Sequence, residues 1–518
     1  MNYSTTKKAA GIKLLGSVSA IIGSLLMAGT AQAAVHGITG TGAKDTFNLT
    51  AEAGYISQPD GARIYAWGYG CTPSVVAAPL APAVDNTPAY LPAGDAGSCP
   101  EMQLPGPTLI VTQGEPVTVT LTNRLPPGAG ATSIIFPGMA VTAVSGTPGI
   151  LTSEALTGGG TVSYSFTPDK PGTYAYYSGT QSDLQVEMGL SGAIVVLPST
   201  TTATTGVCKA KGRFSLAAAA YDQKDSCYDR EYLFQFTELS SNIHDQVKAQ
   251  VDACPTGPCA QIAATMEPYR PNYFMVNGRS MPDDMETAYS PSFPNQPYNG
   301  NPHMHPGENV LMRVIGQGQW QHPFHFHGNH ARVLARDANM LLSQTSAANL
   351  AGPLLFTIAT VPGQTVDAIF TWTGQGLNWD VYGTQPHTCN GQTIEQANSL
   401  RQTNPSSPLL TGFDTQTLPV ATHEYCGDHG KPFPVTPPDP SIVVNGQWYA
   451  GTPYLGLQTV GNQTPEAPGT LNQNPEGGYA YMWHSHNERE ITTSDVFPGG
   501  MLMMLLIDPF TFDIDETL

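Results

Sequence analysis

Basic residues are scarce in this chain. Its 518 residues include 21 lysines and arginines against 40 aspartates and glutamates, so the formal net charge is −19. A chain this acidic repels the phosphates of nucleic acids and of anionic lipids. We therefore expect no nucleic-acid partner and no binding to a membrane surface, which leaves cations and neutral small molecules as partners.

Long apolar runs are also scarce. The one long run, residues 14–29, follows three lysines and precedes the small residues Ala-Gln-Ala at 31–33. This order is typical of a secretory signal peptide, so we assign residues 1–33 to one. No later stretch approaches the ~18 uninterrupted apolar residues of a membrane helix. We therefore predict a periplasmic or secreted protein without a membrane span.

The eight cysteines lack the compact Cys/His spacing of a zinc site, and an oxidising compartment favours disulfides. Connectivity cannot be read from sequence alone, so the pairing is an expectation based on proximity. The expected local pairs are Cys71 with Cys99, Cys208 with Cys227, Cys254 with Cys259, and Cys389 with Cys426.

The chain resembles itself. The segment GEPVTVTLTNRLP at 114–126 aligns with GENVLMRVIGQGQ at 307–319, and GGTVSYSFT at 159–167 aligns with GQTVDAIFT at 363–371. Further on, TYAYYSG at 173–179 aligns with YAYMWHSH at 479–486 when Ser178 is set on Ser485. The order is the same in both copies, and 54 glycines and 45 prolines favour turn-rich β-structure. We therefore expect two homologous β-domains, sandwiches or barrels of Greek-key type.

A Thr-rich stretch at 197–206 marks the expected linker, so the first domain is predicted at 38–197 and the second at 207–512. The second copy carries a Pro/Gly/Asn-rich insertion at about 384–476, with Cys389 and Cys426 inside it. A loop this long usually covers a site or a partner surface. The one expected helix lies at 241–251, with Ser241 or Asn242 as its cap.

Histidines are concentrated in two short segments. The segment HPFHFHGNH at 322–330 alternates His325 and His327 with phenylalanines, and YMWHSHNERE at 481–490 alternates His484 and His486. In strands, residues two apart share a face, and facing side chains of neighbouring strands lie ~5 Å apart. Four imidazoles would then surround one small volume, which suits copper or zinc. The alternative is that these histidines serve packing or surface chemistry.

These segments together resemble the multicopper oxidase family, whose members are built from cupredoxin domains. HPFHFHG at 322–328 matches the family motif HPxHxHG, and YMWHSHNERE followed by PGGMLMML at 498–505 matches HCHxxxH…GM imperfectly. Residues 106–123 and 171–196 are similar to the family's first domain. The resemblance implies an all-β fold of tandem cupredoxin-like Greek-key domains, copper as the cofactor, and oxygen and a small reductant as partners.

The departures from the family pattern concern its blue copper site, which uses two histidines, a cysteine thiolate and often an axial methionine. His322 and Met501 match the pattern, whereas Ser485 replaces the cysteine and Glu490 stands where the second histidine belongs. His322, Glu490 and Met501 remain candidate metal residues by position. A serine hydroxyl is a poor copper ligand, so we expect no standard blue site.

The first domain lacks the copper ligands that the first domain of the family supplies. The alignment places Ile135, Pro137, Tyr177 and Gly179 at its histidine positions. What remains is a half-site in the second domain, in which the resemblance makes His325 a type 2 ligand and His327, His484 and His486 type 3 ligands.

Three interpretations of this half-site stay open: a copper-dependent oxidoreductase, a copper-binding or delivery protein without turnover, and a structural cupredoxin scaffold. In the first, Glu488, Glu490 or Tyr177 completes the metal shell. Two-domain family members often form trimers, so a homo-oligomer whose partner subunit supplies the missing ligands is a further expectation. The substrate stays open.

Other candidate residues carry weaker signals. The pair His303 and His305 is either a loop-surface pair or a second copper site. The methionines Met501, Met503 and Met504 are expected to lie in the core. The histidines His387, His423 and His429 are expected to be surface or loop-stabilising residues.

Overall fold

The computed structural model describes residues 35–40, 45–72, 75–76, 98–199, 218–384, 386–414, 424–432, 451–452, 477–509, 512 and 514. The expected signal peptide, residues 200–206 of the Thr-rich linker and much of the insertion lie outside these residues. Within the described part of the chain, no helix is long and apolar enough to cross a membrane.

The first domain is a sandwich of two sheets. One has the strand order β1-β6-β13-β12 and the other β3-β2-β7-β11-β8. Alternating burial along β7 points Val117, Val119 and Leu121 into the core, as expected for half-buried strands. The strands are β1 (Ile38–Thr39), β2 (Asp45–Ser57), β3 (Arg63–Cys71), β6 (Leu109–Thr112), β7 (Val117–Asn123), β8 (Thr142–Ala143), β11 (Thr161–Phe166), β12 (Gly172–Tyr177) and β13 (Ser191–Leu197), with the short pairs β4 (Val75–Val76) with β5 (Ser98–Cys99) and β9 (Thr147–Pro148) with β10 (Ser153–Glu154).

The second domain is also a sandwich of two sheets. One has the order β17-β16-β19-β25-β21-β22, with β23 beside β21, and the other has the order β18-β30-β29-β20-β24, with β28 beside β29. The strands are β16 (Arg230–Leu239), β17 (Tyr273–Val276), β18 (His303–Met304), β19 (Asn309–Gly316), β20 (His322–Phe326), β21 (Ala331–Arg336), β22 (Asn339–Met340), β23 (Leu354–Leu355), β24 (Thr357–Thr360), β25 (Thr365–Thr371), β28 (Gly451–Thr452), β29 (Tyr479–Ser485) and β30 (Leu502–Ile507).

The strand topology confirms the internal duplication. In the first domain β7 runs parallel to β2 and antiparallel to β11, and in the second domain β19 runs parallel to β16 and antiparallel to β25. In the facing sheets, β13 pairs parallel with β6 and antiparallel with β12, just as β30 pairs with β18 and β29. The aligned sequence segments therefore occupy equivalent strands, and the chain has the expected all-β, tandem cupredoxin-like fold.

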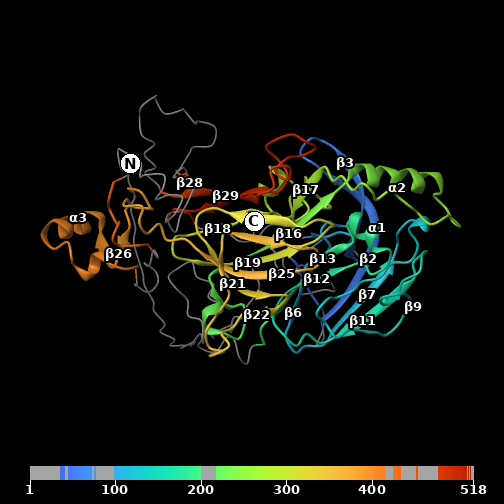
Figure 1. The fold of residues 1–518 in the computed structure, drawn as a ribbon, viewed down its shortest axis with the longest axis horizontal. Coiled ribbons are helices and arrows are strands. Elements are labelled where there is room, and N and C mark those ends of the chain that lie inside the picture. The colour runs from blue at the N-terminus through green and yellow to red at the C-terminus, as the bar shows by residue number, and fades with distance from the viewer. Residues whose placement is uncertain are drawn as a thin grey trace, which may run out of the picture.

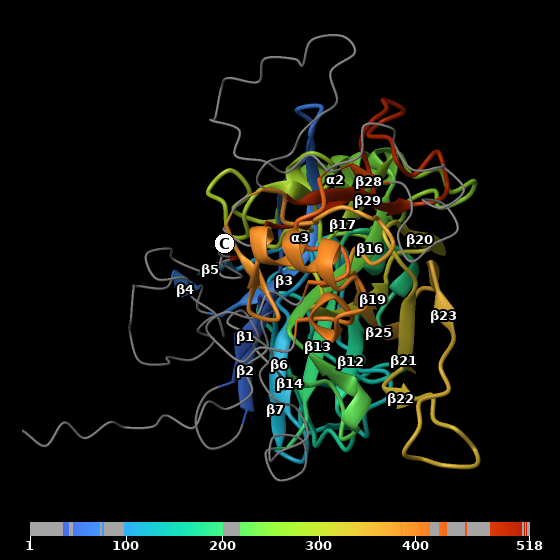
Figure 2. The ribbon, with the colours of Figure 1, turned by 90° about the vertical axis from the view of Figure 1, so that its left-hand side faces the viewer.

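Among the described residues, three α-helices accompany the sheets. The predicted helix is confirmed as α2 (Ser241–Ala253), although its N-cap is Ser240, whose side chain makes no capping hydrogen bond. The helices α1 (Ser182–Glu187) and α3 (Ile394–Thr403) were not predicted. Figure 1 shows α3, which belongs to the insertion, at one end of the long axis, and α2 near the other end above the strands of the first domain. Figure 2 looks onto α3 along that axis.

The two domains share a buried polar contact. Asp367 of β25 accepts a hydrogen bond of 2.6 Å from the hydroxyl of Thr173 in β12 and another from Tyr221. Arg313 of β19 donates to the same Thr173 hydroxyl at 3.0 Å and forms an ion pair of 3.1 Å with Glu231. Because these groups are buried and hydrogen-bonded to one another, they define how β12 lies against β19 and β25.

Three of the expected disulfides are confirmed: Cys71–Cys99, Cys254–Cys259 and Cys389–Cys426. Cys227 is also disulfide-bonded, and its expected partner, Cys208, lies outside the described residues. The insertion is therefore tied by the Cys389–Cys426 bond, as its sequence suggested.

Candidate metal centre

The two histidine segments lie on neighbouring strands, as the sequence analysis expected. Strand β20 pairs antiparallel with β29, and His325 lies directly opposite His484. The alternate residues Phe324, Phe326 and Trp483 are completely buried in the core of the second domain. The pleat therefore directs the histidines to one face and the aromatic rings to the other.

The four imidazoles gather around one point. The ring centroid of His325 lies 5.0 Å from that of His327, 5.4 Å from that of His484 and 4.8 Å from that of His486. The Nε2 atoms of His327 and His484 are 3.4 Å apart. One ring nitrogen from each of His325, His327 and His484 lies within 4.8 Å of the others, close enough to hold a metal ion. The structure thus brings all four predicted histidines together.

Hydrogen bonds orient two of these rings from behind. His325 Nδ1 lies 2.9 Å from the hydroxyl of Thr357 in β24, and His484 Nδ1 lies 2.7 Å from the carbonyl oxygen of Ser485. A carbonyl oxygen accepts only, so Nδ1 of His484 carries the proton and donates it. This arrangement leaves Nε2 as the lone-pair nitrogen, which is the usual arrangement of a histidine that binds a metal.

The environment also favours the neutral form of two of these imidazoles, His325 and His484. Burial and the neighbouring His327, His484 and His486 lower the pKa of His325 to about 4, and burial lowers the pKa of His484. Neutral imidazole is the form that binds metal ions. The cluster is therefore ready to bind a cation at neutral pH without first losing protons from these two rings.

One side of the cluster faces solvent. His484 is buried and His325 is partly buried, whereas His486 is exposed. Phe356, whose ring centroid is 5.7 Å from that of His325, is 49% exposed, so apolar surface borders the imidazoles. Glu488 is exposed as well and contributes to the electrostatic environment of His484. The His486 side of the cluster therefore borders solvent.

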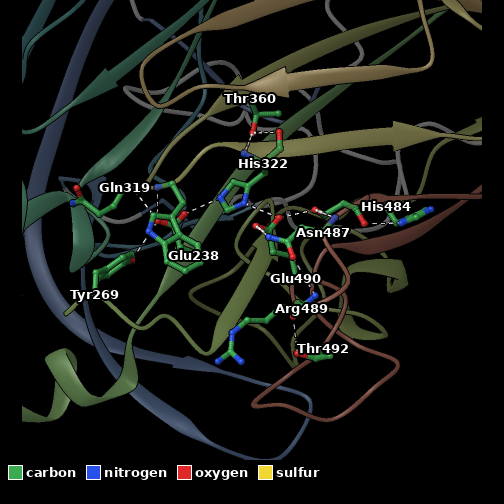
Figure 3. Close-up of polar contacts among 12 residues, drawn as sticks. Glu238, Tyr269, Gln319, His322, Thr360, His484, Asn487, Arg489, Glu490 and Thr492 are labelled. Carbon is green, nitrogen blue, oxygen red and sulfur yellow. Dashed lines mark hydrogen bonds and ion pairs between the residues drawn. The ribbon is translucent and has the colours of Figure 1, made fainter. Parts of the chain in front are cut away.

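The opposite face of the same strands carries a different site. His322 is fully buried; its Nε2 lies 2.8 Å from Glu238 of β16 and its Nδ1 lies 2.9 Å from Glu490. Figure 3 shows the imidazole between these two carboxylates. The contact with Glu490 is an ion pair without the alignment of a hydrogen bond. Ser485 donates its hydroxyl to Glu490 at 2.5 Å.

This second site is unsuited to blue copper. Burial opposes protonation of His322, but the two carboxylates outweigh it and raise its pKa to about 9, so the ring is a cation at neutral pH. An imidazolium has no lone pair for a metal. Met501 is fully buried, and its backbone amide donates to the carbonyl of Glu490. His322, Glu490 and Met501 thus lie together, as the alignment implied, but the donor set fits a buried ion pair and not a copper ion.

Glu490 therefore does not belong to the four-histidine shell. Its carboxylate contacts His322, Ser485 and Asn487, on the reverse face of β29 from His484. Of the three residues suggested to complete the metal shell, Glu490 lies away from the imidazoles, because its carboxylate contacts Ser485, and Ser485 and His484 point to opposite faces of the strand.

The first domain shows the equivalent strand pair without histidines. Ile135 and Tyr177 are bridged in antiparallel fashion, as His325 and His484 are in the second domain. The Tyr177 hydroxyl lies beside Gly363, in the turn between β24 and β25. The structure thus supports the alignment that placed Ile135 and Tyr177 at the family's histidine positions.

His303 and His305 fit neither alternative, a surface pair or a shared copper site, because His305 is fully buried and the two rings contact different groups. His303 Nδ1 contacts Asp508 at 2.8 Å, whereas His305 Nε2 lies 2.8 Å from the backbone oxygen of Phe512. The two rings serve separate contacts with the C-terminal segment. Met503 is fully buried in the core of the second domain, as predicted.

One cluster of buried polar side chains was not predicted. His387 and His429 were expected to be surface or loop-stabilising residues; both are buried, which excludes the surface alternative, and they face Asp380 and Glu424. The four residues together are of a kind that can hold a metal ion. The sequence did hold one signal for this cluster: His387 and His429 lie close in sequence to Cys389 and Cys426, which a disulfide brings together. His423 lies outside the described residues.

A family model described as multicopper oxidase matches residues 98–201, and a second model of the same description matches residues 265–379, which include the HPFHFHG motif. These two matches support membership of the multicopper oxidase superfamily. That family implies copper as the cofactor, and the four-histidine cluster has the donor set that fits it.

Among solved structures, the chain is similar to the multicopper oxidase mgLAC, with 15% identity, a TM-score of 0.45, and coverage of 91% of this chain and 87% of that one. It is also similar to the blue copper oxidase from Nitrosomonas europaea, with 14% identity, a TM-score of 0.45, and coverage of 89% and 85%. A copper nitrite reductase from Nitrosomonas europaea has 16% identity and a TM-score of 0.38, and the match covers 63% of this chain and 84% of that one. No curated protein matches this sequence.

Proposed function

We propose that this chain binds copper through His325, His327, His484 and His486 and acts as an exported copper-dependent oxidoreductase that lacks a standard blue copper site. The observation that carries the proposal is the convergence of these imidazoles on one face of β20 and β29, with Nε2 atoms 3.4 Å apart in His327 and His484. Protonating neighbouring imidazoles together would cost free energy because their charges repel. The low pKa of His325, about 4, favours the neutral form, which binds metal ions.

Bound copper supplies one-electron redox chemistry. The chain's own residues orient the ligands through Thr357 and the carbonyl of Ser485, and they leave the side of His486 open to solvent. Because His322, Ser485 and Glu490 form an ion-pair network where the family has its electron-entry site, electrons must come directly from a small reductant at the open side. Oxygen is the proposed acceptor.

The compartment follows from the cysteines. Three disulfides suit an oxidising environment, so we place the protein in the periplasm or outside the cell. We also propose that an N-terminal signal peptide directs export. The second domain of the mature protein is proposed to end near residue 512.

The second candidate function is copper binding, storage or delivery without turnover. The observation in its favour is the absence of histidines at Ile135 and Tyr177, which leaves the chain with half of the family's cluster. A homo-oligomer in which a second copy supplies further ligands beside the exposed Phe356 would instead restore oxidase chemistry.

Oxygen uptake separates these functions. Copper-loaded protein is offered Cu(I) and simple phenols in turn, and oxygen consumption and peroxide release are followed. Catalytic uptake that is lost in His484→Ala and kept in His330→Ala supports the oxidoreductase. Copper binding without uptake supports the storage function, and rapid four-electron reduction to water supports ligands from a second copy.

A further inference from the structure

The cluster of Asp380, His387, Glu424 and His429, hereafter the insertion tetrad, lies where the insertion leaves the second domain. It is at the far end of β29 from the four histidines: Trp379, next to Asp380, donates its indole N–H to Tyr479, which begins that strand. The side chain of His387 stacks edge-on against Tyr382 at 5.4 Å. The insertion tetrad is therefore a separate site from the candidate copper centre.

All four side chains of the insertion tetrad are buried, and each offers one ligand atom within 4.8 Å of the others. Nε2 of His387 lies 3.3 Å from Asp380 Oδ2 and 3.2 Å from Glu424 Oε2, and Nδ1 of His429 lies 3.4 Å from Asp380 Oδ2. Charge-assisted hydrogen bonds are shorter, about 2.7–2.9 Å. Ligand atoms bonded to one tetrahedral ion at about 2.0–2.1 Å are about 3.3 Å apart. These three separations match the edges of a tetrahedral metal shell, whereas Nδ1 of His429 lies 2.7 Å from Glu424 Oε1, at hydrogen-bond distance.

Backbone groups around the insertion tetrad fix the orientation of its ligands. His429 Nε2 lies 2.9 Å from the carbonyl oxygen of Gln392 and donates to it, which turns Nδ1 toward the cluster. Asp380 accepts hydrogen bonds from the amides of Tyr382 at 2.9 Å and Gly430 at 2.6 Å. Metal-binding histidines usually donate their second N–H to a carbonyl or carboxylate, and metal-binding carboxylates are themselves hydrogen-bonded.

The covalent framework brings the ligands together from distant positions. His387 lies two residues before Cys389, and Glu424 and His429 flank Cys426, so the Cys389–Cys426 bond joins the two halves of the insertion tetrad. Helix α3 adds a contact, because Arg401 donates to the backbone oxygen of His429 at 2.6 Å. Its start is fixed by a capping box between Thr393 and Gln396.

We propose that Asp380, His387, Glu424 and His429 bind one zinc ion that holds the insertion against the second domain. Two imidazole nitrogens and two carboxylate oxygens are ligands that zinc prefers, and a closed set of four buried protein ligands is typical of structural zinc. The competing arrangement is a pair of imidazolium–carboxylate ion pairs without metal, in which Asp380 and Glu424 raise the pKa of His387 to about 11 against the effect of burial.

Zinc content tests the proposal in the full mature chain carrying His325→Ala and His484→Ala, so that the candidate copper centre does not contribute. After EDTA treatment, zinc loading and desalting, elemental analysis should find one zinc per chain. The further substitutions His387→Ala and His429→Ala should remove it. The matched control His303→Ala, whose ring forms an ion pair with Asp508, should retain it.

Cobalt gives a second, spectroscopic readout of the insertion tetrad. The Co²⁺-loaded background protein should show the strong visible absorption of tetrahedral cobalt, and zinc should displace it. Glu424→Gln should lose this spectrum while keeping the fold, as judged by circular dichroism. Absence of zinc, or zinc retained after both histidines are replaced, would overturn the proposal in favour of the ion-pair network.

Discussion

His325 and His484 lie directly opposite each other in β20 and β29, and the next pair along the same two strands is Phe324 opposite Ser485. Because strand residues alternate between faces, this register separates two chemically different sites by the thickness of one sheet. One face holds the four-histidine cluster with its solvent-exposed side, and the other holds the buried cation of His322.

The absence of a blue copper site gives a spectroscopic prediction. Copper-loaded protein should lack the intense blue charge-transfer band of a copper–thiolate bond, and it should oxidise ordinary phenolic laccase substrates poorly. Ser485→Cys alone should not restore the band, because Glu490 and Glu238 still hold His322 as a cation. Visible absorption of both proteins is the measurement, and a strongly blue wild type would show that the motif is misaligned.

The His322 ion pair gives a pH dependence of stability. Its folded-state pKa, about 9, lies above the ordinary value of 6.5, so the stabilisation is complete below about pH 6.5 and is lost as the pH rises through 9. The shift corresponds to a few kcal/mol at most, on the order of 3. Metal-free wild type and His322→Gln should differ most in melting temperature near pH 6 and least near pH 10. A difference that does not change between these pH values would contradict the charged form of His322.

Removing one carboxylate of this ion pair should destabilise the second domain. Glu490→Gln leaves the His322 cation with Glu238 alone and weakens the contact with Ser485. Breaking a buried ion pair costs about 3–5 kcal/mol, so denaturant unfolding of the metal-free protein should show a loss of that order. Glu488→Gln is the matched control, since this neighbouring carboxylate is exposed and should change the unfolding free energy by less than about 0.5 kcal/mol. Equal effects of the two substitutions would mean that Glu490 is not held in a buried ion pair.

The fold and the four-histidine cluster could be predicted because their signals are local and periodic. The alternation of His325 and His327 with phenylalanines, and the repeated strand segments, each lie within about ten residues of sequence. The cross-strand pairing of His325 with His484 then follows from the duplicated topology. Strand alternation also implies that Ser485 and His484 face opposite ways, so Glu490, which contacts Ser485, was the weaker of the residues suggested to complete the metal shell.

The rest depended on contacts that no local pattern reveals. Glu238 lies 84 residues before His322 on another strand, in a segment whose other residues suit an ordinary buried strand. The insertion tetrad draws its ligands from separate loop positions, and only the fold brings Asp380 to Glu424. Loop segments have no periodicity, so their buried faces could not be read from the sequence.

Copper content is the most direct test of the account. Purified mature protein, loaded with copper and dialysed, should retain copper that is lost when His325 and His486 are both replaced by alanine. His330→Ala, in the same segment, should retain the wild-type amount. Loss of metal in the double variant alone is the predicted result; a wild type that retains no copper, or that binds zinc at the four histidines in preference to copper, would contradict the central claim.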